Sequence, residues 1–142
     1  KRLMRNLFKT SNGFMTDIDF ERSIEKLDLL NKDVLVYSRL FSLGRPADKE
    51  SVKIIINILK KAVGVEGTLI FPTYTLNSYK EPRVFDLRKS KIMSGVLGQV
   101  SLLDEEFERS IHPVYSNSIY GKNKEDLKIL PINLLVFIVF MQ

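Results

Sequence analysis

The sequence has 142 residues, of which 44% are hydrophobic, 10% aromatic and 27% charged, fractions close to those of soluble globular domains. Cysteine is absent and His112 is the only histidine, which excludes disulfides, thiolate metal sites, a cysteine nucleophile and any metal site built from several histidines. The net charge is +5, but four of the 22 basic residues precede the first acidic residue, Asp17, which leaves 18 basic against 17 acidic residues. We therefore interpret residues 1–15 as a basic N-terminal arm and expect no nucleic-acid partner.

The first half of the chain carries the clearest pattern of secondary structure. Thr16 and Asp19 have the spacing of a capping box and predict a helix over residues 17–30. Residues 33–38 (DVLVYS) and 68–71 (TLIF) predict two short buried strands, and residues 46–63 predict a helix that begins near Pro46 and stops at Gly64. This order predicts an α/β fold in which the two strands are parallel neighbours, joined by the helix in a right-handed crossover.

The second half of the chain is less regular. Residues 72–91 are polar and rich in aromatic residues, and their length is typical of a functional loop. A short helix is predicted over residues 94–103 and a third strand over residues 117–120. Residues 134–141 are all apolar but far too few to cross a bilayer as a helix, so they predict a buried strand and no membrane partner. We expect a cytoplasmic protein.

Two segments have residues suited to chemistry. Residues 38–46 leave a strand and enter a helix, so their backbone N–H groups can face an anion, and Arg39 and Arg45 add charge suited to phosphates. An ordinary turn with solvated arginines is the commoner interpretation of such a connection. Residues 109–116 (RSIHPVYS) place His112 among hydroxyl groups, where it can act as a donor or an acceptor near neutral pH, although a structural histidine fits equally well.

Taken together, several segments carry a more specific signal. They are NKDVLVYS at residues 31–38, the pair Leu43 and Gly44, VGVEGTLIFPT at residues 63–73, and RSIHPVYS at residues 109–116. In order and spacing they resemble the aminoglycoside 3-N-acetyltransferase family (antibiotic N-acetyltransferases), whose patterns are GD-x-hydrophobic-VHSSL-x-SLG, VG-x-x-GTL-x-(M/F)PT and RS-x-HP-x-HS. The resemblance covers about residues 25–128 and only the N-terminal half of that family.

The resemblance implies a parallel βαβ core of the antibiotic N-acetyltransferase type, forming a partial acetyltransferase domain over residues 16–142. It also implies acetyl transfer from acetyl-CoA, without a metal, to an amino group of an aminoglycoside or a related amino sugar. The biological role would be antibiotic resistance or the acetylation of an amino sugar in a polysaccharide.

The resemblance further implies which residues bind and react. The expected CoA-binding residues are Ser38, Ser42, Leu43, Gly44 and Arg45. The expected acceptor-binding residues are Tyr74, Asn77, Asp86, Gln99 and Tyr115. His112 is the only candidate for a catalytic histidine, and we expect it to organise or bind the acceptor in preference to acting as the primary base.

The sequence also departs from the family pattern. Tyr37 and Tyr115 stand where the family has histidines, Arg39 replaces a serine, and Gln99 stands where a glutamate is common. The main catalytic histidine of the family lies in its second half, and no histidine follows His112. Since losing a general base typically costs about 10²–10⁴ in rate, we expect this apparently truncated chain not to be a competent enzyme.

The alternative is therefore a catalytically silent remnant that binds at most CoA or a partner. Loss of half of a shared core would also leave the strand over residues 134–141 without partners. We expect such an exposed apolar edge to favour self-association.

Overall fold

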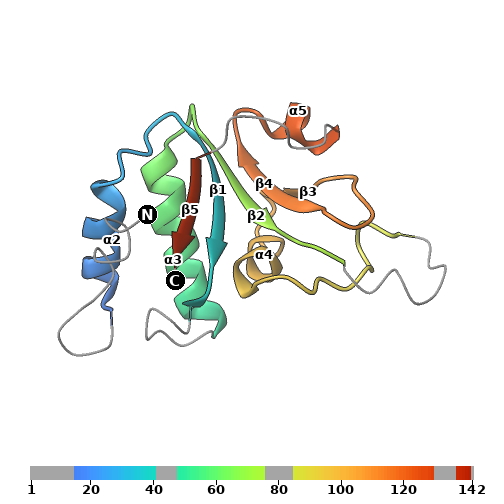
Figure 1. Cartoon of the computed structure of the whole chain (residues 1–142), viewed down its shortest axis with the longest axis horizontal. Coiled ribbons are helices and arrows are strands. Elements are labelled where there is room, and N and C mark those ends of the chain that lie inside the picture. Colours follow the sequence, from blue (N-terminus) through green and yellow to red (C-terminus); the bar gives the residue numbers. More distant parts are fainter. Residues whose placement is uncertain (1–14, 41–47, 76–84, 130–136, 142) are drawn as a thin grey trace.

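A computed structural model of the chain describes residues 15–40, 48–75 and 85–129 and the backbone of residues 137–141. These residues form a five-stranded sheet with helices on both faces (Figure 1). The elements are α2 (Asp17–Glu25), β1 (Asp33–Ser38), α3 (Lys49–Val63), β2 (Thr68–Pro72), α4 (Val96–Ser101), β3 (Glu108–Arg109), β4 (Asn117–Gly121), α5 (Lys124–Ile129) and β5 (Phe137–Met141). None of the helices in these ranges has the length and apolar character needed to span a membrane.

The sheet has the strand order β3-β4-β2-β1-β5. β1 is parallel to β2, and α3 crosses between them, which confirms the predicted βαβ unit. β4 is a strand as predicted, and it runs antiparallel to β2. β5 pairs in parallel with β1, so the expectation that the C-terminal strand lacks partners is wrong.

Helix α3 forms the centre of the larger core. It begins at Lys49, later than the predicted start, because Asp48 has an extended backbone and caps the helix by accepting a 3.0 Å hydrogen bond from the N–H of Ser51. Pro46 lies outside the described residues. One face of α3 is buried, and it packs with α2 and α4 against one face of the sheet. The buried residues of α3 are Val52, Ile55, Ile56, Leu59 and Val63.

Helix α2 begins as predicted and ends early. The Thr16 hydroxyl accepts from the Asp19 N–H at 3.2 Å, and the Asp19 carboxylate accepts from the Thr16 N–H at 3.3 Å, which forms the capping box. The prediction that the helix reaches residue 30 is wrong, because Asp28 and Asn31 adopt φ angles of 48° and 59°. This left-handed backbone cannot continue a helix, and it turns the chain into β1.

The two faces of the sheet have different cores. Residues of β1 and β2 that alternate along the strands, among them Val34, Val36 and Phe71, face the helices α2, α3 and α4. A smaller cluster on the other face includes Leu35 and Leu127, the latter from α5. Tyr37 packs against this smaller cluster. The alternation of β1 therefore places Tyr37 on the α5 side of the sheet.

Helix α4 spans less of the chain than the predicted range of residues 94–103 and lies across the carboxyl end of β2. A Cβ atom at Gly98 would stand 2.2 Å from the carbonyl oxygen of Pro72, which is too close for any side chain. Gly98 therefore allows the helix backbone to touch the strand. This contact places α4 beside the ends of the two parallel strands.

Candidate functional site

A cleft opens where β1 and β2 separate. The two strands pair only from Asp33 opposite Thr68 to Leu35 opposite Ile70, and the cleft of about 160 Å³ lies beyond the last pair, at the carboxyl ends of the strands. The start of α4 closes one side of it. Among the described residues, its lining contains no charged side chain and includes Val36, Tyr37, Ser38, Pro72, Tyr74, Ser94, Gly95, Leu97 and Gly98.

Tyr74 is the central polar side chain of this cleft. Its hydroxyl group is hydrogen-bonded to the hydroxyl of Tyr37. Its N–H donates to the Oγ of Ser94 at 2.7 Å, and that hydroxyl donates to the carbonyl of Pro72 at 2.9 Å, so Ser94 fixes the backbone at the rim. Burial raises the pKa of the Tyr74 phenol, and the hydrogen bond with Tyr37 raises it further. The phenol therefore stays neutral and can both donate and accept hydrogen bonds.

The loop of residues 112–116 lies directly beside Tyr74, because the pairing of β2 with β4 continues past the ends of both strands. The N–H of Thr73 donates to the Ser116 carbonyl and the N–H of Thr75 to the Val114 carbonyl, both at 2.9 Å. The Tyr115 ring then meets the Tyr74 ring edge to face, with centroids 5.3 Å apart. Two of the sequence motifs, about 40 residues apart, thus meet at the cleft.

His112 has one ring nitrogen engaged by its own loop. Its Nδ1 accepts hydrogen bonds from the N–H of Tyr115 at 2.7 Å and the N–H of Val114 at 3.2 Å. In the neutral ring the proton therefore lies on Nε2, which makes Nε2 a donor and leaves no free acceptor on the ring. This geometry agrees with an organising role for His112, and that role stays a prediction.

Arg109 is the first residue of the motif RSIHPVYS, but the sequence assigned no role to it. Its side chain is buried, with an exposed fraction of 6%, and burial lowers the pKa of its guanidinium. It donates to the Thr73 carbonyl at 3.0 Å, the Ser90 carbonyl at 2.8 Å, the Leu87 carbonyl at 3.2 Å and the Ser116 hydroxyl at 3.1 Å. Arg109 thus ties the loop of residues 85–90 to the wall of the cleft.

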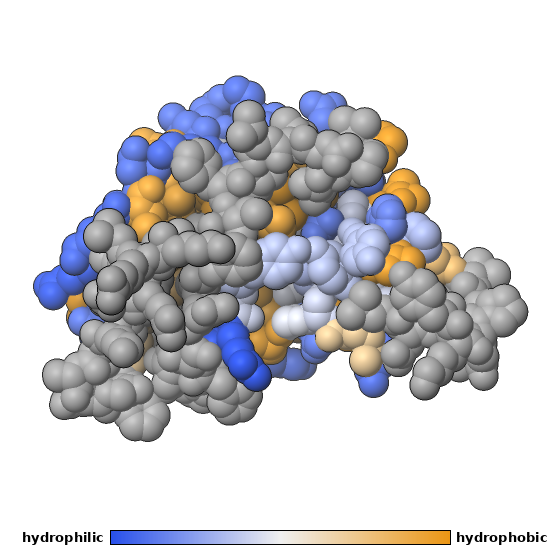
Figure 2. All heavy atoms as spheres, in the orientation of Figure 1, coloured by the Kyte–Doolittle hydropathy of each residue, from blue (hydrophilic) through white to orange (hydrophobic). Residues whose placement is uncertain are grey.

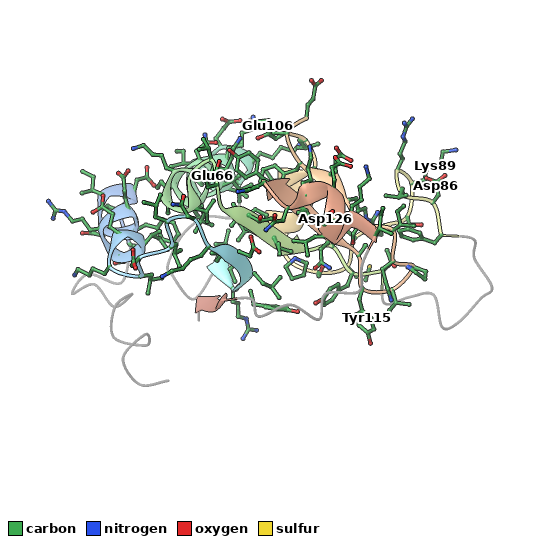
Figure 3. All side chains as sticks on the ribbon, turned by 90° about the horizontal axis from the view of Figure 1, so that it is seen from above. Glu66, Asp86, Lys89, Glu106, Tyr115 and Asp126 are labelled. Atoms are coloured by element: carbon green, nitrogen blue, oxygen red, sulfur yellow. The ribbon has the colours of Figure 1, made fainter. Side chains whose placement is uncertain are left out.

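The structure brings together some of the predicted site residues and separates others. Ser38 and Tyr74 line the cleft, and Tyr115 touches Tyr74. Gln99 is exposed on α4 outside the lining, with its Nε2 3.5 Å from the Ile92 carbonyl. Asp86 lies apart from Tyr115 (Figure 3), and its carboxylate accepts from the N–H groups of the two residues of its own turn, Arg88 and Lys89.

Other predicted residues lie outside the described part of the chain, and they are Ser42, Leu43, Gly44, Arg45 and Asn77. Within the described ranges, no three histidine, aspartate or glutamate side chains come close enough to hold a metal ion.

Comparison with known families decides the identity of the fold. The family model for aminoglycoside 3-N-acetyltransferase matches residues 35–130, more than half of the chain. The chain belongs to this family. The matched range includes all the residues that line the cleft and the loop of residues 112–116.

Solved structures of acetyltransferases share the fold. Aminoglycoside acetyltransferase AAC(3)-Xa is 20% identical with a TM-score of 0.69, and the alignment covers 89% of this chain and 50% of that one. AAC-IIIb in a binary complex with CoASH is 22% identical, with a TM-score of 0.64 and coverages of 79% and 48%. AAC-VIa bound to sisomicin is 16% identical, with a TM-score of 0.68 and coverages of 83% and 50%.

The chain therefore spans about half the length of these solved relatives. No curated protein matches the sequence.

Proposed function

We propose that this acetyltransferase-family chain takes part in acetyl transfer from acetyl-CoA to an amino group of an aminoglycoside or a related amino sugar. The observation that carries the proposal is the cleft at the carboxyl ends of β1 and β2, since ligands of open α/β sheets bind at such ends. The solved relatives with CoASH and with sisomicin support a CoA cosubstrate and an amino-sugar acceptor. Because acetyl-CoA is an intracellular cosubstrate, the proposed location is the cytoplasm.

The size of the cleft limits what it holds. Its volume of about 160 Å³ is well below the roughly 300–1,000 Å³ of pockets that enclose drug-sized ligands. It therefore accommodates the reacting ends of two substrates, the thioester and the amine. In the reaction the amine nitrogen bonds to the acetyl carbon while the carbon–sulfur bond breaks, and the proton of the amine passes through a base to the CoA sulfur.

The residues of this chain contribute binding and orientation. Ser38, at the end of β1, is the CoA-binding residue within the described part of the chain, and we propose the same role for Ser42, Leu43, Gly44 and Arg45. Tyr74, which lines the cleft, and Tyr115, whose ring touches Tyr74, are the proposed acceptor contacts at the cleft. Asn77, Asp86 and Gln99 remain proposed acceptor contacts, although Asp86 and Gln99 lie outside the cleft lining.

A second candidate function is a CoA-binding domain without turnover. It is favoured by the geometry of His112, the only histidine, whose Nδ1 already accepts two N–H groups. A general base must have a free lone pair within reach of the proton that it removes. Self-association through β5 receives no support from the structure.

The test is to incubate the 142-residue chain, and a version extended through any sequence that naturally follows it, with acetyl-CoA and a panel of amino sugars. We expect acetylated products, detected by mass spectrometry, from the extended form and far less from the 142-residue form. Comparable acetylation by both forms would show that the base is already present, with His112 as the only histidine available. No product and no acetyl-CoA binding with either form would refute the proposed function.

A further inference from the structure

Four aromatic rings form a continuous row that begins in the cleft. We call Tyr37, Tyr74, Tyr115 and His112 the aromatic row. Successive ring centroids are 6.4 Å, 5.3 Å and 5.5 Å apart. Tyr37 and Tyr74 line the cleft, whereas 53% of the surface of Tyr115 is exposed. The row therefore leads from the cleft to the solvent.

The fold brings two members of the row to the same residue. The rings of Tyr37 and Tyr115 lie against Tyr74 from two different segments of the chain. A phenol carries no charge near neutral pH. The three tyrosines thus provide a neutral surface of rings and hydroxyl groups.

Negative charge is also lacking at this surface. No acidic residue lines the cleft or belongs to the aromatic row within the described ranges. The carboxylate of Asp86 is engaged in its own turn, and the α4 residue Gln99 is neutral. The middle of the face drawn in Figure 2 is pale, which marks residues of intermediate hydropathy. In the described part of this surface, a ligand with several ammonium groups would find few carboxylates to balance its charge.

We propose that the aromatic row binds the acceptor, that it selects an amino sugar with a single ammonium group over a polycation, and that Tyr37 is a further specificity-determining residue. This inference rests on the proposed function. The apolar C–H face of a sugar ring stacks on the phenol rings, and its hydroxyl groups hydrogen-bond with the phenols. One ammonium group can lie over an aromatic face without a carboxylate.

The hydrogen bond between the hydroxyl groups of Tyr37 and Tyr74 is the reason for assigning a specificity role to Tyr37. Its hydroxyl is hydrogen-bonded to that of Tyr74, which stays protonated because burial raises its pKa. Tyr37 thus fixes the direction in which the Tyr74 hydroxyl group can form a further hydrogen bond in the cleft. Replacing Tyr37 by phenylalanine keeps the ring and removes this partner, so the loss of one neutral hydrogen bond is expected to weaken sugar binding about two- to tenfold.

The test is calorimetric titration of the 142-residue chain with acetyl-CoA, with a methyl glycoside of glucosamine, which carries one ammonium, and with sisomicin, which carries several. Each sugar is titrated at about 50 mM and about 500 mM NaCl, since attraction between exposed charges is screened over this range. We expect the glucosaminide to bind more tightly than sisomicin, with an affinity that changes less than about twofold with salt.

Three variants distinguish sugar binding by the aromatic row from a general effect of substitution on the protein. Tyr37→Phe is expected to weaken glucosaminide binding as above, and Tyr115→Leu, which removes an exposed ring, is expected to weaken it by about tenfold. Tyr120→Phe is the matched control, because Tyr120 packs against Phe107 and Lys60 away from the cleft, and it should leave sugar binding unchanged.

Three results would overturn the inference: tighter, salt-sensitive binding of sisomicin, no binding of the glucosaminide, or unchanged glucosaminide affinity in both Tyr37→Phe and Tyr115→Leu. If acetyl-CoA still binds, the proposed function survives any of these results. If acetyl-CoA does not bind, the proposed function fails, and the inference fails with it.

Discussion

Replacing Arg109 by methionine removes the side chain that joins three segments around the cleft. The guanidinium of Arg109 donates four hydrogen bonds, three of them to backbone carbonyls. The Thr73 carbonyl keeps a partner in the variant, since it also accepts from the Ser116 hydroxyl at 2.7 Å. The carbonyls of Leu87 and Ser90 belong to a loop near the surface and can reach water after a small movement.

The size of the effect follows from these contacts. Each hydrogen bond from a charged group contributes about 1.5–3 kcal/mol, but the variant no longer buries a charge, which offsets part of the loss. We expect Arg109→Met to lose about 2–4 kcal/mol of unfolding free energy, which corresponds to a fall of about 1–2 M in the urea midpoint. Arg109→Lys keeps the charge, but a single nitrogen cannot span four spread acceptors, so about half of the loss should remain.

Two assays check this prediction, urea unfolding followed by circular dichroism and limited trypsin digestion. The loop that Arg109 holds contains the exposed trypsin sites Arg88 and Lys89, and cleavage there should become faster in Arg109→Met. Arg22→Met, on the exposed side of α2, is the control and should change stability by less than about 0.5 kcal/mol. Equal urea midpoints and equal cleavage rates in the two methionine variants would refute the assigned role of Arg109.

Three further changes test other parts of the structure. Gly98→Ala places a Cβ against the Pro72 carbonyl and should lower stability by about 1–3 kcal/mol in urea unfolding, and an unchanged midpoint would contradict the close contact. Lys60→Met removes an ion pair with Asp104 and a cation that lies 4.7 Å from the centroid of the Tyr120 ring. The variant should lose about 1–2 kcal/mol of unfolding free energy, and a more stable variant would count against these contacts. The hydrogen bonds of the α2 capping box hold the pKa of Asp19 below its ordinary value, so the ionised carboxylate stabilises the fold at neutral pH and this stabilisation is lost as the carboxyl group gains its proton. Asp19→Ala should therefore lose less unfolding free energy than the wild type on acidification. An equal loss in both proteins would refute this assignment.

The parts of the fold that were predictable from sequence depend on local signals. The capping box at Thr16 correctly gave the start of α2. The stop at Gly64 and the apolar runs of β1 and β2 also act within a few residues, so they identified the βαβ unit correctly. The early end of α2 was missed because left-handed turns are most readily recognised at glycine, and here an aspartate and an asparagine adopt this conformation. β3 and α5, with two and six residues, are too short to produce a clear periodic pattern.

The site was predictable only in part, for a different reason. Tyr74 and Tyr115 were expected near the acceptor, and the continued pairing of β2 with β4 brings them together. Arg109 was missed because most of its partners are backbone carbonyls, which leave no trace in the pattern of side chains. Tyr37 was noted only as a departure from the family pattern, since the fold alone brings it to Tyr74.

The central claim, that this chain binds acetyl-CoA at the cleft between β1 and β2, is tested most directly by titrating the ¹⁵N-labelled 142-residue chain with acetyl-CoA and following its amide resonances. The account predicts saturable shifts at Ser38, Tyr74 and Gly95, which line the cleft. Asn123, which hydrogen-bonds to Asp33 at the opposite ends of the strands, should not shift. Shifts confined to Asn123 and its neighbours, or no saturable shifts at the cleft, would contradict the account.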